Sequence, residues 1–177
     1  MISQEEIKSF LEGNDPEEHI VCVEFDYMKD CIYKIKEIPT TGKVIQRDTF
    51  IAFAWVGDLR NLNFYQDSKA LQKEAMTKYS IVIEKLETKG NERLESGLKF
   101  MVKSLKGYRT LIQFFRDGGL DPWSDRAKDK ILILPPVEQY LISKEKRLFK
   151  GYEEYNDITR FVFDLETTAL EPKDGRI

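Results

Sequence analysis

Short runs of β-branched and aromatic residues recur along the sequence and alternate with segments of helical spacing. His19–Phe25 (HIVCVEF) and Cys31–Ile38 (CIYKIKEI) are two such runs, and the turn-rich DYMKD between them predicts a β-hairpin. A third strand is expected at Asp48–Val56 (DTFIAFAWV), because a continuous apolar run is typical of a strand buried on both faces. None of these runs approaches the roughly 18 apolar residues that a membrane-spanning helix needs, so a transmembrane protein is excluded.

The segments between these runs carry the signals of helices and of further strands. Helices are expected from Ile2 to Leu11, from an Asp67 cap through Met76, from an Asn91 cap through Leu105, over Tyr108–Phe115, and from Pro136 through about Lys146. Further strands are expected at Tyr79–Leu86, at ILIL (131–134) and at Arg160–Leu165. This order predicts an α+β fold in which a mixed β-sheet is accompanied by several helices.

The amino-acid composition argues against several classes of protein and indicates the cellular compartment. The 177 residues hold 28 Lys+Arg and 31 Asp+Glu, and the resulting net charge of −3 argues against a general nucleic-acid coat. Cys22 and Cys31 do not make a disulfide framework, and a single histidine cannot build a His-rich metal site. The start MISQEEIKSFLEG has acidic residues where a signal peptide has positive charge. We therefore expect a protein of the reducing cytoplasm.

Two carboxylates form the sharpest motif. Asp164 and Glu166 lie two residues apart in FVFDLETT, on an expected strand, so both side chains point to the same face. Carboxylate oxygens are the ligands that hard divalent cations prefer. Two adjacent carboxylates can bridge a pair of metal ions about 4 Å apart, which suits in-line attack of water on a phosphodiester. An isolated D-x-E is more often a solvated surface pair, and the extended motif is far more specific.

The stretch FDLETTALEP resembles the first motif of the DnaQ-like, ribonuclease H-like 3′–5′ exonucleases. The resemblance implies that Asp164 and Glu166 are catalytic ligands of two Mg²⁺ ions, and that Thr167 and Thr168 flank the terminal nucleotide. In that family, further acidic ligands come from later motifs. Because the motif begins shortly before Ile177, we expect the isolated chain to be inactive as an enzyme.

The residues before this motif narrow the resemblance. Tyr140–Ile142 lies on an expected helix that ends in a basic run, and a short linker then leads to the FDLET strand. This arrangement is similar to that of the phage-type family B DNA polymerases. The resemblance is specific in sequence over residues 135–177, and over residues 1–130 it rests on the order of domains and elements. It implies an N-terminal domain at 1–155 and the start of a 3′–5′ exonuclease domain at 156–177. The parent protein would then be a DNA-directed DNA polymerase, that is, a nucleotidyltransferase that acts in DNA replication and has proofreading activity. It would act in the host cytoplasm if it is viral. The sequence would be a fragment of it.

A basic stretch, LKFMVKSLKGYRTLIQFFR (98–116), is the candidate contact to DNA. On the expected helix, Lys99, Lys103 and Lys106 follow at i, i+4 and i+7, and Arg109 comes next. Such a stripe could follow the phosphates of a template single strand. A solvated helix face is the more ordinary interpretation, and the aromatic residues Tyr108, Phe114 and Phe115 are more often core than base-stacking. A stand-alone nucleic-acid-binding module without catalysis, in which the D-x-E is incidental, remains the alternative function.

Overall fold

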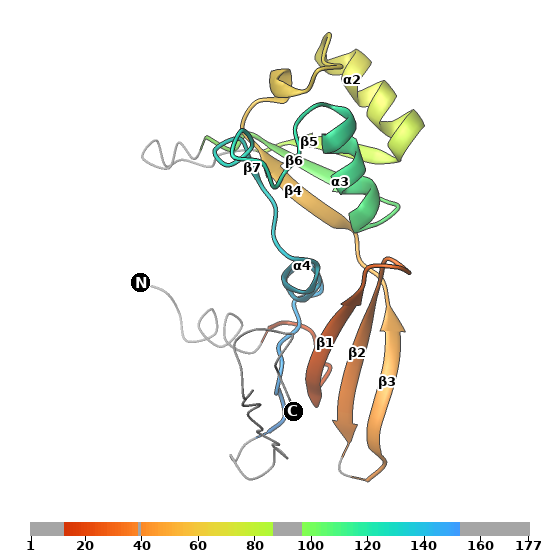
Figure 1. Ribbon diagram of the computed structural model, residues 1–177. Helices are drawn as coiled ribbons and strands as arrows, with labels where there is room; N and C mark the ends of the chain where they lie inside the picture. The colour runs from red at the N-terminus through yellow and green to blue at the C-terminus, as the bar shows by residue number, and fades with distance from the viewer. Residues whose placement is uncertain (1–12, 39, 87–96, 153–177) are drawn as a thin grey trace, which may run out of the picture.

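Two antiparallel sheets and the helices beside them make up the part of the chain that the structure describes (Figure 1). The computed structural model describes residues 13–38, 40–86 and 97–152. The α+β class predicted from the sequence is confirmed. The helix expected at residues 2–11 and the strand expected at residues 160–165 lie outside the described residues, and the division at residue 155 stays a prediction.

The first sheet has three strands in the order β1-β2-β3. β1 (Ile20–Asp26) and β2 (Cys31–Ile38) form the predicted hairpin, in which Asp26 pairs with Cys31 across the turn. β3 (Gly42–Asp48) then pairs along the whole of β2. The sequence did not indicate β3, because its residues GKVIQRD are mostly exposed and carry no apolar alternation.

The second sheet has the order β5-β6-β4-β7. Its strands are β4 (Ala52–Val56), β5 (Ile81–Lys85), β6 (Phe100–Ser104) and β7 (Ile131–Leu132). The strand expected at residues 48–56 is confirmed over Ala52–Val56, and its expected start is wrong, because Asp48 ends β3 in the first sheet. The helix expected from Asn91 through Leu105 is wrong over its second half, because residues 100–104 are the strand that pairs with both β4 and β5, and its first residues, 91–96, lie outside the described residues.

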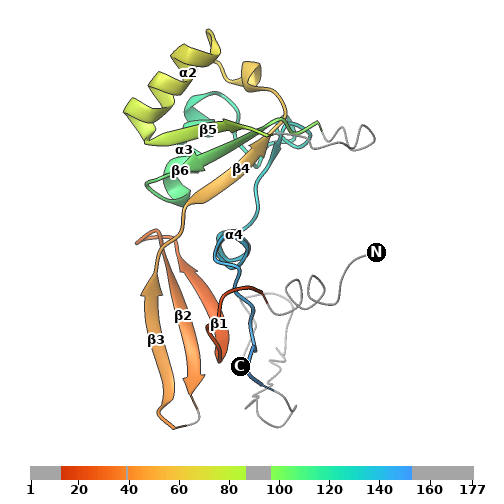
Figure 2. The same cartoon turned by 180° about the vertical axis from the view of Figure 1, so that it is seen from behind.

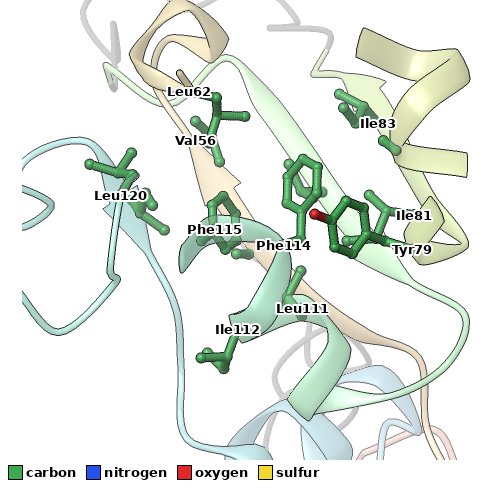
Figure 3. Close-up of a cluster of buried hydrophobic side chains, with 14 of the residues drawn as sticks. Val56, Leu62, Tyr79, Ile81, Ile83, Leu111, Ile112, Phe114, Phe115 and Leu120 are labelled. Carbon is green, nitrogen blue, oxygen red and sulfur yellow. The ribbon is translucent and has the colours of Figure 1, made fainter. Parts of the chain in front are cut away.

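Two helical segments lie on one side of the second sheet. α2 (Ser68–Glu74) begins where Asp67 accepts hydrogen bonds from the backbone N–H groups of Lys69 and Ala70, as predicted, and a π-helical turn (Ala75–Tyr79) extends it. α3 (Tyr108–Asp117) is confirmed and packs its apolar face on β4 and β6. Figure 3 shows the resulting core, to which α3 contributes Leu111, Ile112, Phe114 and Phe115. The expectation that Tyr108, Phe114 and Phe115 are core residues is confirmed.

α4 (Pro136–Ser143) lies between the two sheets, as both views show (Figures 1 and 2). It begins at a proline, which lacks the N–H group that a first helical turn leaves unpaired, and it ends three residues before the expected Lys146. Tyr140 is fully buried among residues of the first sheet, and its hydroxyl donates a hydrogen bond of 2.8 Å to Asp48. α4 contacts both β1 and β4, so it joins the two sheets. No helix in the three described ranges is long and apolar enough to cross a membrane.

Candidate nucleic-acid interface

The acidic motif and its threonines lie beyond the part of the chain that the structure describes. Asp164, Glu166, Thr167 and Thr168 therefore keep the roles that the resemblance implies as predictions. Between residues 13 and 152, leaving out 39 and 87–96, no three His, Cys, Asp or Glu side chains are placed to hold a metal ion. The expectation of Mg²⁺ thus depends on Asp164 and Glu166, whose oxygen donors suit that ion chemically.

The lysine stripe predicted on a helix does not exist, because its residues lie on and around strand β6. Lys103 belongs to β6 and forms an ion pair of 2.6 Å with Glu84 on β5. Lys99 precedes the strand, where its N–H donates to the carbonyl of Val56, and Lys106 lies in the turn that follows. Side chains alternate between the two faces of a strand, so Lys99 and Lys103, four positions apart, share one parity, whereas Lys106 does not, and the three lysines no longer form one row.

Arg109 is separated from the lysines by the start of α3. The carboxylate of Asp30 accepts hydrogen bonds from the backbone N–H groups of Tyr108 and Arg109, which fixes this end of the helix beside the β1–β2 turn. Gly107 is required here, since its φ is 111° and a Cβ atom would lie 2.5 Å from the Asp30 carboxylate. The guanidinium of Arg109 donates to the carbonyl of Met28 at 3.2 Å. Within the described residues it has no carboxylate within 4 Å, so its charge is available to a ligand.

The outer face of α3 carries a polar stripe that the sequence analysis did not single out. Arg109, Gln113 and Arg116 are exposed and follow one another at i, i+4 and i+7, the spacing that places side chains in one row on a helix. The signal was present in the sequence, because these positions alternate with the apolar ones that α3 buries. Within the predicted stretch, α3 thus carries a row of exposed basic residues in addition to the exposed Lys99 and Lys106.

The face of the second sheet opposite α3 contains an apolar hollow of about 340 Å³. Phe53 and Trp55 from β4 pack edge to face there, with ring centroids 4.9 Å apart. The other residues that line the hollow are Ile51, Met101, Lys103, Ile142 and Ser143. Lys103 is the one charged residue among those that line this hollow, and it already pairs with Glu84. The hollow therefore favours an apolar group over a phosphate.

A compact cluster of charges holds the two ends of the described chain together. The carboxylate of Glu17 accepts hydrogen bonds from Lys34 at 2.6 Å, Lys146 at 2.7 Å and Lys36 at 3.2 Å. Lys146 also pairs with Asp15 at 2.9 Å. Burial alone would raise the pKa of Glu17, but the hydrogen bonds from the lysines outweigh it and lower this pKa from 4.5 to about 2.

Backbone hydrogen bonds strengthen the same connection. The N–H of His19 donates to the carbonyl of Lys150, and the N–H of Phe149 donates to the carbonyl of Ile20, both at 2.8 Å. Residues 144–152 are thereby fixed along the N-terminal strap, defined here as residues 13–19. This cluster was not predicted from the sequence, although Lys34 and Lys36 share one face of β2, an i, i+2 pattern that indicates a charged site on a strand.

Comparisons with protein-family models, with curated proteins and with solved structures find no match to this chain.

Proposed function

We propose that this chain is the N-terminal portion of a phage-type family B DNA polymerase with 3′–5′ proofreading activity. In that protein it supports the exonuclease domain and contacts the template single strand. The observation that carries the proposal is the motif FDLETT, with Asp164 and Glu166 two residues apart, behind the helix that contains Tyr140–Ile142. Asp164 and Glu166 would hold Mg²⁺ for attack of water on the terminal phosphodiester, together with acidic residues of later motifs.

The packing of residues 136–152 supports the role as a scaffold. α4 buries Tyr140 and Gln139 completely, so the helix that precedes the acidic motif is anchored in the domain. The Glu17 cluster and the two backbone hydrogen bonds then fix residues 144–152, the segment that leads toward Asp164. A rigid lead-in of this kind suits a domain that must position a nuclease centre.

Extending the chain tests the proposal directly. We expect the 177-residue chain to lack Mg²⁺-dependent nuclease activity, because two carboxylates hold a metal pair poorly without further ligands. A chain that continues with the residues encoded after Ile177 should degrade single-stranded DNA from its 3′ end. Asp164→Ala should lower that rate at least about 100-fold, whereas Asp174→Ala, the same change outside the motif, should not.

Three outcomes would overturn the proposal. One is a stop codon directly after Ile177. The second is a continuation without further acidic exonuclease motifs. The third is nuclease activity of the extended chain that Asp164→Ala leaves intact.

A further inference from the structure

A second hollow, of about 320 Å³, lies on the outer side of α3 and combines aromatic and cationic side chains. Its lining residues are Tyr27, Tyr108, Arg109, Ile112, Gln113, Arg116 and Trp123. They come from three segments: the β1–β2 turn, α3, and the loop after α3. Figure 1 shows this turn beside the N-terminal end of α3. The hollow therefore includes the exposed stripe of α3 and adds an aromatic residue from each neighbouring segment.

The two added aromatic side chains are unusually exposed. Tyr27 is 62% exposed and Trp123 is 59% exposed, although large aromatic side chains are ordinarily buried on average. The ring of Tyr27 packs edge to face on Phe25 at 4.8 Å. The backbone N–H of Trp123 donates to Asp121, whose carboxylate also lies 3.5 Å from Arg116, so the backbone that carries the indole is fixed beside the hollow. An exposed aromatic ring has few rotatable bonds, so it can stack on a flat ligand with little loss of entropy.

The cations of the hollow are available for anions. The guanidinium of Arg109 donates to the Met28 carbonyl and, in the part of the chain that the structure describes, forms no ion pair. Arg116 lies 3.5 Å from Asp121 through its Nε atom, and about half of both side chains is exposed, so a bound phosphate would compete only with a weak surface ion pair. These two residues lie seven positions apart on α3, about 10 Å along its axis. A neighbouring hollow of about 400 Å³ shares Arg109 and Gln113 and extends the groove toward Lys29.

We propose that this groove binds single-stranded DNA, with a base stacked on Trp123 and Tyr27 and with phosphates at Arg109 and Arg116. Exposed aromatic faces together with guanidinium groups are the combination that single-strand-binding surfaces use, since every base has a π-face and every nucleotide has a phosphate. An acidic peptide would use the two arginines but would gain little from the two rings. The inference depends on the proposed function in one respect, that the chain meets single-stranded DNA.

The test is a titration of a labelled oligothymidylate with the 177-residue chain, followed by fluorescence anisotropy. Trp123→Ala and Tyr27→Ala should each weaken binding at least about fivefold. Trp123→Phe, which keeps a ring, should retain most of the affinity. The matched control is Phe149→Ala, which removes another exposed aromatic residue outside the groove and should leave binding unchanged.

The salt dependence tests the phosphate contacts separately. Arg109→Gln and Arg116→Gln should each reduce the slope of log affinity against log salt by about 0.7, the value for one phosphate contact on a single strand. Arg47→Gln, the same loss of charge on the exposed strand β3, should leave the slope unchanged.

The binding experiments can fail without affecting the proposed polymerase function. Binding that is insensitive to both aromatic-to-alanine changes would overturn the groove but leave the polymerase assignment intact, because the nuclease experiment involves none of these residues. Equal affinity for a duplex would also overturn the groove, since stacked base pairs hide their faces. So would absence of binding to the oligothymidylate, or displacement of the oligothymidylate by an acidic peptide of equal length.

Discussion

At the scale of single residues, the Glu17 carboxylate has a pKa lowered to about 2, and the contacts that lower it are its hydrogen bonds to lysines. Three lysines converge on it, and two of them, Lys34 and Lys146, are more than nine-tenths buried. Burying an ammonium group without a partner costs free energy. The Glu17 carboxylate offsets this cost for the buried ammonium groups of Lys34 and Lys146. Loss of the Glu17 carboxylate should therefore destabilise two places, β2 and the segment that follows α4.

We predict that Glu17→Gln lowers the free energy of unfolding by about 2 kcal/mol at pH 7, with allowance for its partial exposure. The pKa of Glu17 is lower in the folded state, about 2, than its ordinary value of 4.5. The stabilisation is thus fully present above pH 4.5 and is lost as the pH falls toward 2. Urea denaturation at several pH values should show the wild-type chain and Glu17→Gln converging in stability below pH 4.5.

Glu84→Gln is the matched control for this prediction. The Glu84–Lys103 pair has the same 2.6 Å separation as the Glu17–Lys34 pair, but half of the Glu84 side chain is exposed. An exposed pair contributes between about 0 and 1 kcal/mol. Equal losses for Glu17→Gln and Glu84→Gln, or a Glu17→Gln loss that does not change with pH, would contradict the role of burial.

At the scale of secondary-structure elements, α4 is held by a side chain that completes the backbone hydrogen bonds of its neighbours. Gln139 is fully buried, accepts a hydrogen bond of 2.7 Å from the N–H of Phe53, and donates one of 2.8 Å to the carbonyl of Leu134. The first bond connects α4 to β4, and the second closes the loop that enters the helix. One amide group thereby satisfies a buried backbone N–H and a partly buried backbone carbonyl.

We predict that Gln139→Leu destabilises the fold by about 2 to 4 kcal/mol, although leucine is similar in size and more apolar. The loss arises because the Phe53 N–H remains buried without a partner and the partly buried Leu134 carbonyl also loses its hydrogen bond. Chemical denaturation measures the effect, and Gln72→Leu on the exposed face of α2 is the control, expected to change the stability by less than about 0.5 kcal/mol. A Gln139→Leu variant as stable as the control would show that these two bonds contribute little.

The same scale explains which elements the sequence could predict. β1, β2, α2 and α3 were predictable because their turn residues, caps and apolar periodicity are local. β6 was not, because Leu98, Met101, Val102 and Leu105 recur at helical spacing. Its strand conformation depends on pairing with Ala52–Val56, almost fifty residues earlier, which no local pattern records. Tertiary pairing here outweighed the local preference.

The candidate site was predictable only in part, for a related reason. Arg109 was recognisable from charge, but the side chains around it come from distant segments. Tyr27 follows β1, and the packing of the β1–β2 turn against α3 brings it to Arg109. Trp123 lies in the polar loop after α3 and joins the same hollow because Asp121 holds that loop beside Arg116. The error over Lys99, Lys103 and Lys106 followed directly from the error over β6, since their spacing had meaning only on a helix.

At the scale of the whole molecule, a row of four aromatic rings connects two apolar cores. The larger core lies between the second sheet and its helices, and the smaller one comprises Ile20, Val23, Ile32 and Tyr140. Phe25 and Phe50 pack against both cores. Ring contacts run from Tyr108 to Phe25 at 5.8 Å, to Phe50 at 6.4 Å, and on to Tyr140 at 6.2 Å. The smaller core is too limited to be stable alone, so we expect it to depend on this row.

We predict that Phe50→Ala uncouples the two sheets as well as lowering the overall stability by about 2 kcal/mol, less than for a fully buried phenylalanine. In the wild-type chain the amides of β2 and β6 should exchange through the same global opening. In Phe50→Ala the amides of β2 should exchange at a distinctly lower free energy than those of β6. Native-state hydrogen exchange measures both sets in one sample.

Phe100→Ala is the control for this uncoupling. Phe100 is also partly buried, but it packs against the larger core alone. Its removal should lower the stability while the amides of β2 and β6 still exchange together. If Phe50→Ala lowers the protection of both sheets by the same factor, as Phe100→Ala is expected to do, the aromatic row does not couple the cores. α4 and its bonds to Asp48 and Phe53 would then be the main connection between the two sheets.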